Sequence, residues 1–474
     1  MFACDDHPVT TRSYTSYDAG NITVADVWAG DAAAQDADPA DGSSDAGADT
    51  DAADGSSVVE LLGAPLVFAT TADGFSLNAV TVGGDTSELS ARARQPGSDD
   101  WRPGAPSSRG SDVLEWKFGD LSAGTRYEYQ VVRTDPEGDA VPLFAGDIVT
   151  QRPPGSEFSF ALLTDSHIAP REVVPGDLSA VDLPEDTLLR VAKNIGDDAP
   201  DFVVHLGDML DFHLFGFNDP PPDGWWTRIA YLNYRRLMQE TLGNATHYPV
   251  IGNWDGENGS YTDEEIARSR EQRLLYLPGP KPDTYPEGGN VHEDYYAFTW
   301  GDALFVVLNV MTYTPTEHLL SSQPGVADDW TLGEAQLDFL KRTLEGATSK
   351  WRFLLIHHAV GGAAGNAANA AYGRGGGQAA HVGEQALVHE LMLEHGVQIF
   401  FYGHDHVFTD IVVDGIHYSL PGSAGAPWKF ETAETGYTEY WTDSGHGRVR
   451  VGPDAVKVEF IALGGEVLYS YTLE

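Results

Sequence analysis

The sequence predicts an α/β fold, a two-sheet β-sandwich flanked by helices, preceded by a disordered acidic segment and a small all-β sandwich. Two observations predict this order. Short alternating apolar runs fill residues 57–152, whereas continuous apolar runs alternate with helical stretches over residues 156–474. Alternation is typical of antiparallel strands, and continuous apolar strands between helices are typical of a sheet covered on both faces.

Residues 1–56 hold twelve Asp and one Arg and are poor in aromatic residues, so we expect a disordered tether. The whole chain carries 72 acidic and 28 basic residues, a formal charge of −44. Such a surface repels nucleic-acid backbones and anionic membranes, which argues against a nucleic-acid polymer as partner. A phosphate substrate would need a local positive centre, and bound metal cations are the candidate.

The N-terminus contains the only cysteine, Cys4, so the sequence predicts neither an intrachain disulfide nor a cysteine metal site. The "MFAC" stretch and the polar run after it resemble the cleavage box of a bacterial lipoprotein, although no charged or apolar segment precedes it. We therefore expect an exported protein, periplasmic, outer-membrane-anchored or extracellular. It would contact a membrane only through lipid on Cys4, and an unmodified Cys4 stays an open alternative.

The all-β segment contains five short runs of strand character, and a Pro-rich "RPPG" linker follows at 152–155. The runs are "PLVFATT", "FSLNAVTV", "LSARARQ", "DVLEWKF" and "YEYQVVR". Within residues 121–131, "LSAGTRYEYQV" resembles the Leu-x-x-Gly-Thr-x-Tyr-x-Tyr segment of fibronectin-III-like domains. In those domains a Tyr near a strand start ties the corner together, so we expect a fibronectin-III-like β-sandwich.

In the second part, apolar runs that end in polar residues alternate with helical stretches. The runs are "FSFALLTDSH", "DFVVHLGD", "YPVIGN", "ALFVVLN", "WRFLLIHH" and "VQIFFYGHDH". Helices are predicted near residues 184–194, 226–242, 262–275, 331–346 and 383–395. The tail from Val407 to Glu474 returns to strands, and we expect it to complete one of the two sheets.

Metal-type side chains follow five of these strands. They are Asp165, His167, Asp208, Asn253, His357, His404 and His406. A single such side chain after a strand most often only forms a turn. In open α/β sheets, however, the carboxyl ends of the strands lie close together, so these seven side chains are expected to form one cluster. Two carboxylates, an amide oxygen and four imidazoles without a thiolate suit Zn, Fe or Mn. Two ions about 3.5–4 Å apart can generate a hydroxide and orient a phosphate, which predicts hydrolysis of a small phosphate ester.

The ordered series Asp-x-His, Gly-Asp, Gly-Asn-x-Asp, His-His and Gly-His-x-His resembles the calcineurin-like metallophosphoesterases over residues 156–474. A fibronectin-III-like domain in front is typical of purple acid phosphatases and their bacterial relatives. The segments "HEDYYAFTWGDALFVVLN" and "TLGEAQLDFLKRTL" look like that family's strand pair and following helix. The resemblance implies a metallophosphoesterase fold with two divalent or mixed-valence metal ions.

The resemblance also implies a role for each strand-end residue. Asp208 would bridge both metals, with the nucleophilic water between them. The first metal would be held by Asp165, His167 and His406, and the second by Asn253, His357 and His404. Two positions depart from the purple acid phosphatases, because Asp211 and His167 stand where that family has Tyr and Gly. Without the phenolate, no purple colour is expected and a divalent pair is favoured.

Trp254 occupies the position where most of the superfamily has His. Indole cannot transfer a proton, and losing a positioned acid typically costs about 10²–10⁴-fold in rate. Three accounts stay open: Trp254 stacks on a good leaving group; His358, His213 or His205 supplies the proton; or catalysis is lost. The last account predicts a non-catalytic cell-surface metal-binding protein that recognises a phosphorylated ligand. We expect Asp208, His358 and Trp254 to serve catalysis and His205 to be a packed strand residue.

Overall fold

The computed structural model describes residues 58–110, 112–169, 183–211, 225–259, 261–314, 331–358, 384–426, 437 and 439–474. The predicted tether with Cys4 and the candidate proton donor His213 lie outside these ranges. In the part of the chain that the structure describes, no helix has the length and apolar character needed to cross a bilayer.

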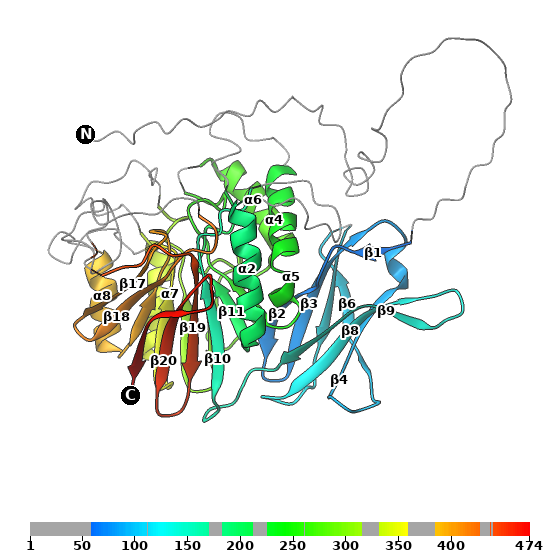
Figure 1. The fold of residues 1–474 in the computed structure, drawn as a ribbon, viewed down its shortest axis with the longest axis horizontal. Helices are drawn as coiled ribbons and strands as arrows, with labels where there is room; N and C mark the ends of the chain where they lie inside the picture. The colour runs from blue at the N-terminus through cyan, green and yellow to red at the C-terminus, as the bar shows by residue number, and fades with distance from the viewer. Residues whose placement is uncertain are drawn as a thin grey trace, which may run out of the picture. The chain divides into compact units, whose positions relative to one another are not determined.

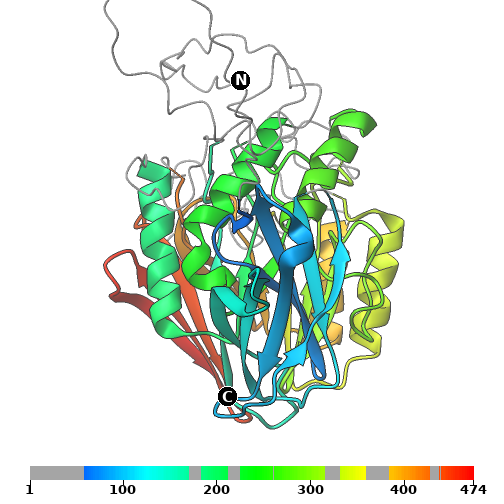
Figure 2. The same ribbon diagram turned by 90° about the vertical axis from the view of Figure 1, so that its right-hand side faces the viewer.

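The first described region is all-β and forms two antiparallel sheets, seen in blue and cyan in Figure 2. One sheet has the order β1-β3-β7-β6, with β2 paired to β3, and the other has the order β5-β4-β8-β9. The strands are β1 (Glu60–Leu61), β2 (Leu66–Thr71), β3 (Gly74–Val82), β4 (Leu89–Arg94), β5 (Arg102–Pro103), β6 (Ala105–Ser108), β7 (Val113–Phe118), β8 (Arg126–Thr134) and β9 (Ala140–Val149). A short 3-10 helix, η1 (Thr86–Glu88), precedes β4.

Aromatic side chains from both sheets fill the core of this region. Phe75 and Trp116 come from one sheet and Tyr129 from the other, and all three are buried. The expected corner tie is present, because the Ser122 N–H donates to the Tyr127 hydroxyl over 3.0 Å. The predicted all-β sandwich is therefore confirmed, whereas its likeness to a fibronectin-III domain stays a prediction.

The second region contains two six-stranded mixed sheets. Their orders are β12-β11-β10-β19-β20-β21 and β13-β14-β15-β16-β18-β17. The strands of the first are β10 (Phe158–Leu163), β11 (Phe202–His205), β12 (Thr246–Pro249), β19 (Gly445–Val451), β20 (Val456–Ala462) and β21 (Val467–Leu473). Those of the second are β13 (Tyr296–Trp300), β14 (Ala303–Val307), β15 (Trp351–Leu355), β16 (Ile399–Phe401), β17 (Phe408–Val413) and β18 (Ile416–Pro421).

The tail completes the first sheet, as expected, and it also contributes β17 and β18 to the second. Strands β17 and β18 join the second sheet, where β18 pairs parallel to β16. Strand β19 pairs antiparallel to β10 on the edge that β11 leaves open, and β20 and β21 extend the first sheet from there. Each sheet edge would otherwise expose unpaired backbone groups, so the two parts of the tail satisfy two different edges.

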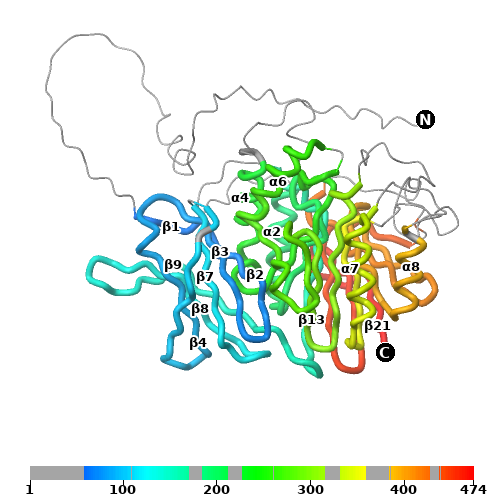
Figure 3. The backbone as a smooth tube through the Cα atoms, turned by 180° about the vertical axis from the view of Figure 1, so that it is seen from behind, coloured from blue at the N-terminus to red at the C-terminus, as the bar shows by residue number. Residues whose placement is uncertain are grey.

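Helices cover the outer faces of the two sheets, as Figures 1 and 3 show. They are α2 (Leu183–Asp198), α4 (Trp225–Leu237), α5 (Gln239–Leu242), α6 (Asp263–Tyr276), α7 (Gly333–Glu345) and α8 (Glu384–Glu394). The predicted helices are confirmed, except that the one expected over 226–242 is divided at Met238. Helix α6 begins with a capping box in which Thr262 and Glu265 bond reciprocally.

The core between the two sheets is rich in aromatic residues. Phe160, Phe202 and Phe305 pack together there, and the ring centroids of Phe160 and Phe202 lie 5.0 Å apart. A separate core lies beneath α7 and α8, around Leu340 and Met392. The described region is thus a two-sheet sandwich flanked by helices, as the sequence predicts.

Candidate metal centre

The predicted ligands follow neighbouring strands of the two sheets. Asp165 and His167 come after β10, Asp208 after β11 and Asn253 after β12. His357 follows β15, and the pair His404 and His406 follows β16. These strands are parallel neighbours within each sheet, so their carboxyl ends meet at one edge. All seven side chains are buried.

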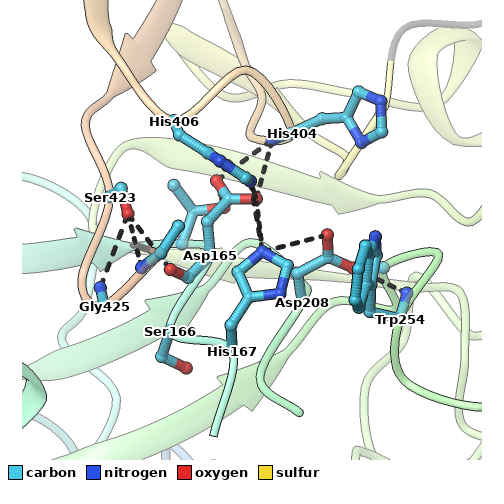
Figure 4. Close-up of polar contacts among 12 residues, drawn as sticks. Asp165, Ser166, His167, Asp208, Trp254, His404, His406, Ser423 and Gly425 are labelled. Carbon is cyan, nitrogen blue, oxygen red and sulfur yellow. Dashed lines mark hydrogen bonds and ion pairs between the residues drawn. The ribbon is translucent and has the colours of Figure 1, made fainter. Parts of the chain in front are cut away.

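The first group consists of Asp165, His167, Asp208 and His406, whose possible ligand atoms all lie within 4.8 Å of one another. The Nε2 atoms of His167 and His406 are 3.1 Å apart, and Asp165 Oδ1 lies 3.3 Å from His406 Nε2. Figure 4 shows His406 directed at His167 and Asp165, whereas the ring of His404 points away from them.

The second group consists of Asp208, His357 and His404, again with ligand atoms within 4.8 Å. Asn253 joins it, because its Oδ1 lies 3.1 Å from His357 Nε2 and 2.9 Å from His404 Nδ1. Asp208 belongs to both groups: its Oδ2 is 3.1 Å from His357 Nε2 and 3.7 Å from His167 Nε2. The structure therefore brings all seven predicted ligands together, with one carboxylate shared by the two groups.

The electrostatics of both groups favour a bound cation. His357 Nδ1 donates to the Leu206 carbonyl oxygen over 2.8 Å, which turns Nε2 toward Asp208. Burial alone would lower the pKa of His357, but the facing Asp208 carboxylate raises it to about 9. Burial lowers the pKa of His167 to about 3, so this imidazole is neutral and keeps its lone pair at neutral pH. For Asp165, burial acts to raise the pKa, but the imidazole of His406 lowers it below the usual range.

The donor atoms fit a pair of metal ions. In the first group Nε2 of His167 faces Nε2 of His406, and in the second His357 Nε2 and His404 Nδ1 both face Asn253 Oδ1. Nitrogen and oxygen donors without a thiolate suit divalent Zn, Fe or Mn.

Backbone strain is concentrated at these positions. Among the described residues, ten that are not glycine have positive φ, and five of them are predicted ligands. Those five are Asp165 (54°), His167 (48°), Asp208 (54°), His404 (79°) and His406 (59°). Each such conformation costs roughly 1–3 kcal/mol and persists where the surroundings enforce it, which is typical of functional sites.

Small residues allow the ligand loops to approach one another closely. A Cβ on Gly252 would lie 2.2 Å from both the backbone nitrogen and Oδ1 of Asp208. A Cβ on Gly403 would lie 2.1 Å from Thr164 Oγ1. Glycine is therefore required at both positions by contact.

Trp254 lies at the edge of the cluster and is half-buried. Its backbone N–H donates to Asp208 Oδ1 over 2.8 Å, and its ring meets the His167 ring edge-on at a centroid distance of 5.0 Å. Figure 4 shows the indole beside Asp208. The side chain is thus next to the first group of ligands.

The histidines considered as proton donors differ in position. The buried ring of His358 packs against the ligand His404, with ring centroids 4.2 Å apart. His205 is fully buried on β11, its Nε2 lies 3.0 Å from Ser166 Oγ, and burial lowers its pKa well below the usual value. His205 is a packed strand residue, as expected, whereas His358 adjoins the cluster.

Two buried carboxylates beside the ligands were assigned no role from the sequence. Asp255 accepts hydrogen bonds from three backbone N–H groups behind Asp208 and Asn253. Asp405 lies between two ligands in sequence and accepts a 2.6 Å hydrogen bond from the Tyr437 hydroxyl. Their only sequence signal is an Asp inside each ligand motif, "GNWD" and "GHDH".

Comparison with solved structures finds the same fold in two other proteins. A purple acid phosphatase, PPD1, from yellow lupin (Lupinus luteus) seeds is 14% identical, with a TM-score of 0.61 over 86% of this chain and 74% of that one. A structure of PhoD is also 14% identical, with a TM-score of 0.65 over 87% of this chain and 90% of that one. Likenesses at this identity establish the fold alone.

Among curated proteins, no sequence match is found. The family model for calcineurin-like phosphoesterases matches residues 158–408, which is more than half of the chain. That span runs from the start of β10 to Phe408 and includes all seven residues of the two groups. The chain therefore belongs to the calcineurin-like phosphoesterase family.

Proposed function

We propose that this protein hydrolyses small phosphate esters at a pair of metal ions. The observation that carries the proposal is the shared carboxylate of Asp208, which belongs to both groups of buried ligand atoms. Asp165, His167 and His406 would hold one ion, Asn253, His357 and His404 the other, and Asp208 both. When bound, two such ions supply an acidified water as nucleophile and positive charge facing the phosphate oxygens.

The chain's own residues orient the site and exclude water. The His357 imidazole is held by the Leu206 carbonyl oxygen, so its Nε2 faces Asp208 before any ligand arrives. The ions would also give a strongly acidic protein the local positive charge that a phosphate ester requires. His358 is the candidate proton donor, because it is the histidine that packs on a ligand without belonging to either group.

Trp254 bears on which esters are cleaved. An indole beside Asp208 and His167 offers an apolar surface where most family members would offer an imidazole. Aryl esters need little help in expelling their leaving group and can contact that surface, so they are the favoured substrates. The second candidate function, recognition of a phosphorylated ligand without turnover, is favoured by the same residue, since Trp254 cannot donate a proton to a leaving group.

The test combines metal content with hydrolysis. Purified parent protein should hold about two metal ions per chain and cleave aryl phosphate mono- or diesters. Asp208→Ala should lose both properties, because it removes the shared ligand. Asp338→Ala removes the same carboxylate from the exposed surface of α7 and should lose neither. Parent protein that binds no metal would contradict the proposal.

Trp254→His separates the two candidate functions. If the protein hydrolyses esters that have good leaving groups, the kcat of the variant should rise roughly 10²-fold on alkyl phosphates and little on aryl phosphates. Two bound metals and no turnover by the parent, with activity restored in Trp254→His, would establish the binding function instead. The measurements are steady-state rates on matched aryl and alkyl phosphates.

A further inference from the structure

Asp255 is a fully buried carboxylate that lies two residues after the predicted ligand Asn253. Its three hydrogen bonds all come from backbone N–H groups. Glu257, two residues later, is buried to the same extent but pairs with Arg270 and Arg273 at 3.1 and 2.5 Å. Asp255 is thus bound by backbone groups, whereas Glu257 is bound by cationic side chains.

The hydrogen bonds of Asp255 join two ligand loops. Its Oδ2 accepts from the N–H of Asp208 over 3.0 Å and from that of Gly252 over 2.8 Å. Its Oδ1 accepts from the N–H of Leu210 over 3.0 Å. One carboxylate thus holds the loop after β11, which carries Asp208, against the loop after β12, which carries Asn253.

This arrangement sets the direction of the shared ligand. Asp208 has a φ of 54°, a conformation that its surroundings must enforce. Its backbone is held by Asp255, and its Oδ1 accepts from the Trp254 N–H. The remaining oxygen, Oδ2, therefore faces His357 Nε2 and lies within 3.7 Å of His167 Nε2.

We propose that Asp255 is a positioning residue of the metal centre. It holds Asp208 and Asn253 in the binding arrangement through its hydrogen bonds to the backbone of their two loops. Asp255 belongs to neither group of ligand atoms, and it acts through its backbone partners. The inference rests on the proposed function only for the presence of metal, and not for hydrolysis.

The test is metal affinity, measured on the full chain after chelation. Asp255→Asn keeps the size of the side chain but removes the charge and one acceptor. We expect Zn²⁺ binding, measured by competition with a chromophoric chelator, to weaken by about 10–100-fold, the usual effect of losing a partner that orients a ligand. At saturation the variant should still bind as many ions as the parent, because every ligand remains.

Glu257→Gln is the matched control. It makes the same chemical change two residues away and breaks a buried ion pair, so it should lower the melting temperatures of the metal-free and Zn²⁺-loaded proteins equally. Asp255→Asn should instead reduce the gap between those two temperatures, since bound metal stabilises the folded state according to its affinity. The inference would be overturned if Asp255→Asn bound Zn²⁺ as tightly as the parent does. It would also be overturned if the difference between the melting temperatures of the metal-free and Zn²⁺-loaded proteins were the same in Asp255→Asn as in the parent.

If Asp255→Asn does not fold, Asp255→Glu is measured, because it keeps the charge and displaces the loops. Weaker Zn²⁺ binding by Asp255→Glu supports the inference, and parental affinity overturns it. If the parent binds Zn²⁺, Asp255→Asn binds it more weakly, and neither protein hydrolyses phosphate esters, then the inference holds and the proposed reaction fails. A parent that binds no metal overturns both.

Discussion

The buried guanidinium of Arg235 joins the α/β region to the all-β region, and its replacement by Met should destabilise the protein strongly. Arg235 lies on α4 with 1% of its surface exposed. Its Nη1 donates to Asn78 Oδ1 and the Tyr276 carbonyl oxygen, at 2.5 and 3.1 Å. Its Nη2 donates to the carbonyl oxygens of Asn78 and Ala64, at 2.8 and 3.3 Å.

The magnitude follows from these four acceptors. Each buried oxygen left without a donor costs about 1–3 kcal/mol, which gives a gross loss of roughly 4–12 kcal/mol. Burial lowers the pKa of Arg235 to about 10, which corresponds to a desolvation cost of about 3 kcal/mol for the charged group. Removing the group offsets the gross loss of stability by that amount. Met retains most of the apolar stem of the side chain. We therefore expect Arg235→Met to lower the free energy of unfolding by about 4 kcal/mol, a value typical of a broken buried polar network.

The assay is urea unfolding followed by tryptophan fluorescence at neutral pH. The control is Arg92→Met on β4, where the half-buried guanidinium donates to Gln130 Oε1 and lies 4.5 Å from the centroid of the Trp101 ring, so a loss of about 1 kcal/mol is expected. A loss for Arg235→Met no greater than that for Arg92→Met would refute the reasoning. Two separate transitions in Arg235→Met alone would show that this residue makes the two regions unfold together.

Two other predictions concern the metal centre and acid stability. Gly252→Ala should reduce bound metal at least 10-fold by elemental analysis, because its Cβ would displace the shared ligand Asp208; full metal content would contradict this. The bonds from Arg448 and Lys457 lower the pKa of Glu459 to about 2, against the effect of burial. Because its folded pKa is depressed, its stabilisation is present above pH ~4.5 and is lost as the pH falls toward 2. Glu459→Gln should therefore cost about 2–3 kcal/mol at pH 7 and little near pH 2 in denaturant unfolding, and an equal cost at both values would count against the ion-pair account.

The ligand cluster could be predicted because each ligand follows a strand that can be recognised from the residues next to it in the sequence. Asp208 and His357 both follow continuous apolar runs, and parallel strands place such positions at one edge of a sheet. No long-range information is needed beyond the expectation that the strands are neighbours. The same local logic predicts the helices, whose apolar periodicity and caps lie within each segment.

Asp255 and Asp405 could not be assigned roles in this way. The Asp208 backbone N–H that Asp255 accepts is 47 residues away, and the Tyr437 hydroxyl that Asp405 accepts is 32 residues away. The contribution of the tail to both sheets also depends on which sheet edges remain open. The sequence of residues 407–474 carries no information about those edges. Strands β5 and β6 could not be predicted either, because they contain Pro103 and Pro106 and proline is disfavoured in strands.

The first ligand of the metal centre is completed only by the far end of the chain. Asp165 accepts from the backbone N–H of His404, 239 residues later, and its carbonyl oxygen accepts from the Ser423 hydroxyl, 258 residues later. A ribosome must therefore synthesise the chain through His406 before the seven proposed ligands can come together. If the proposed ions bind, they would be acquired late in maturation, from the metals available where folding finishes.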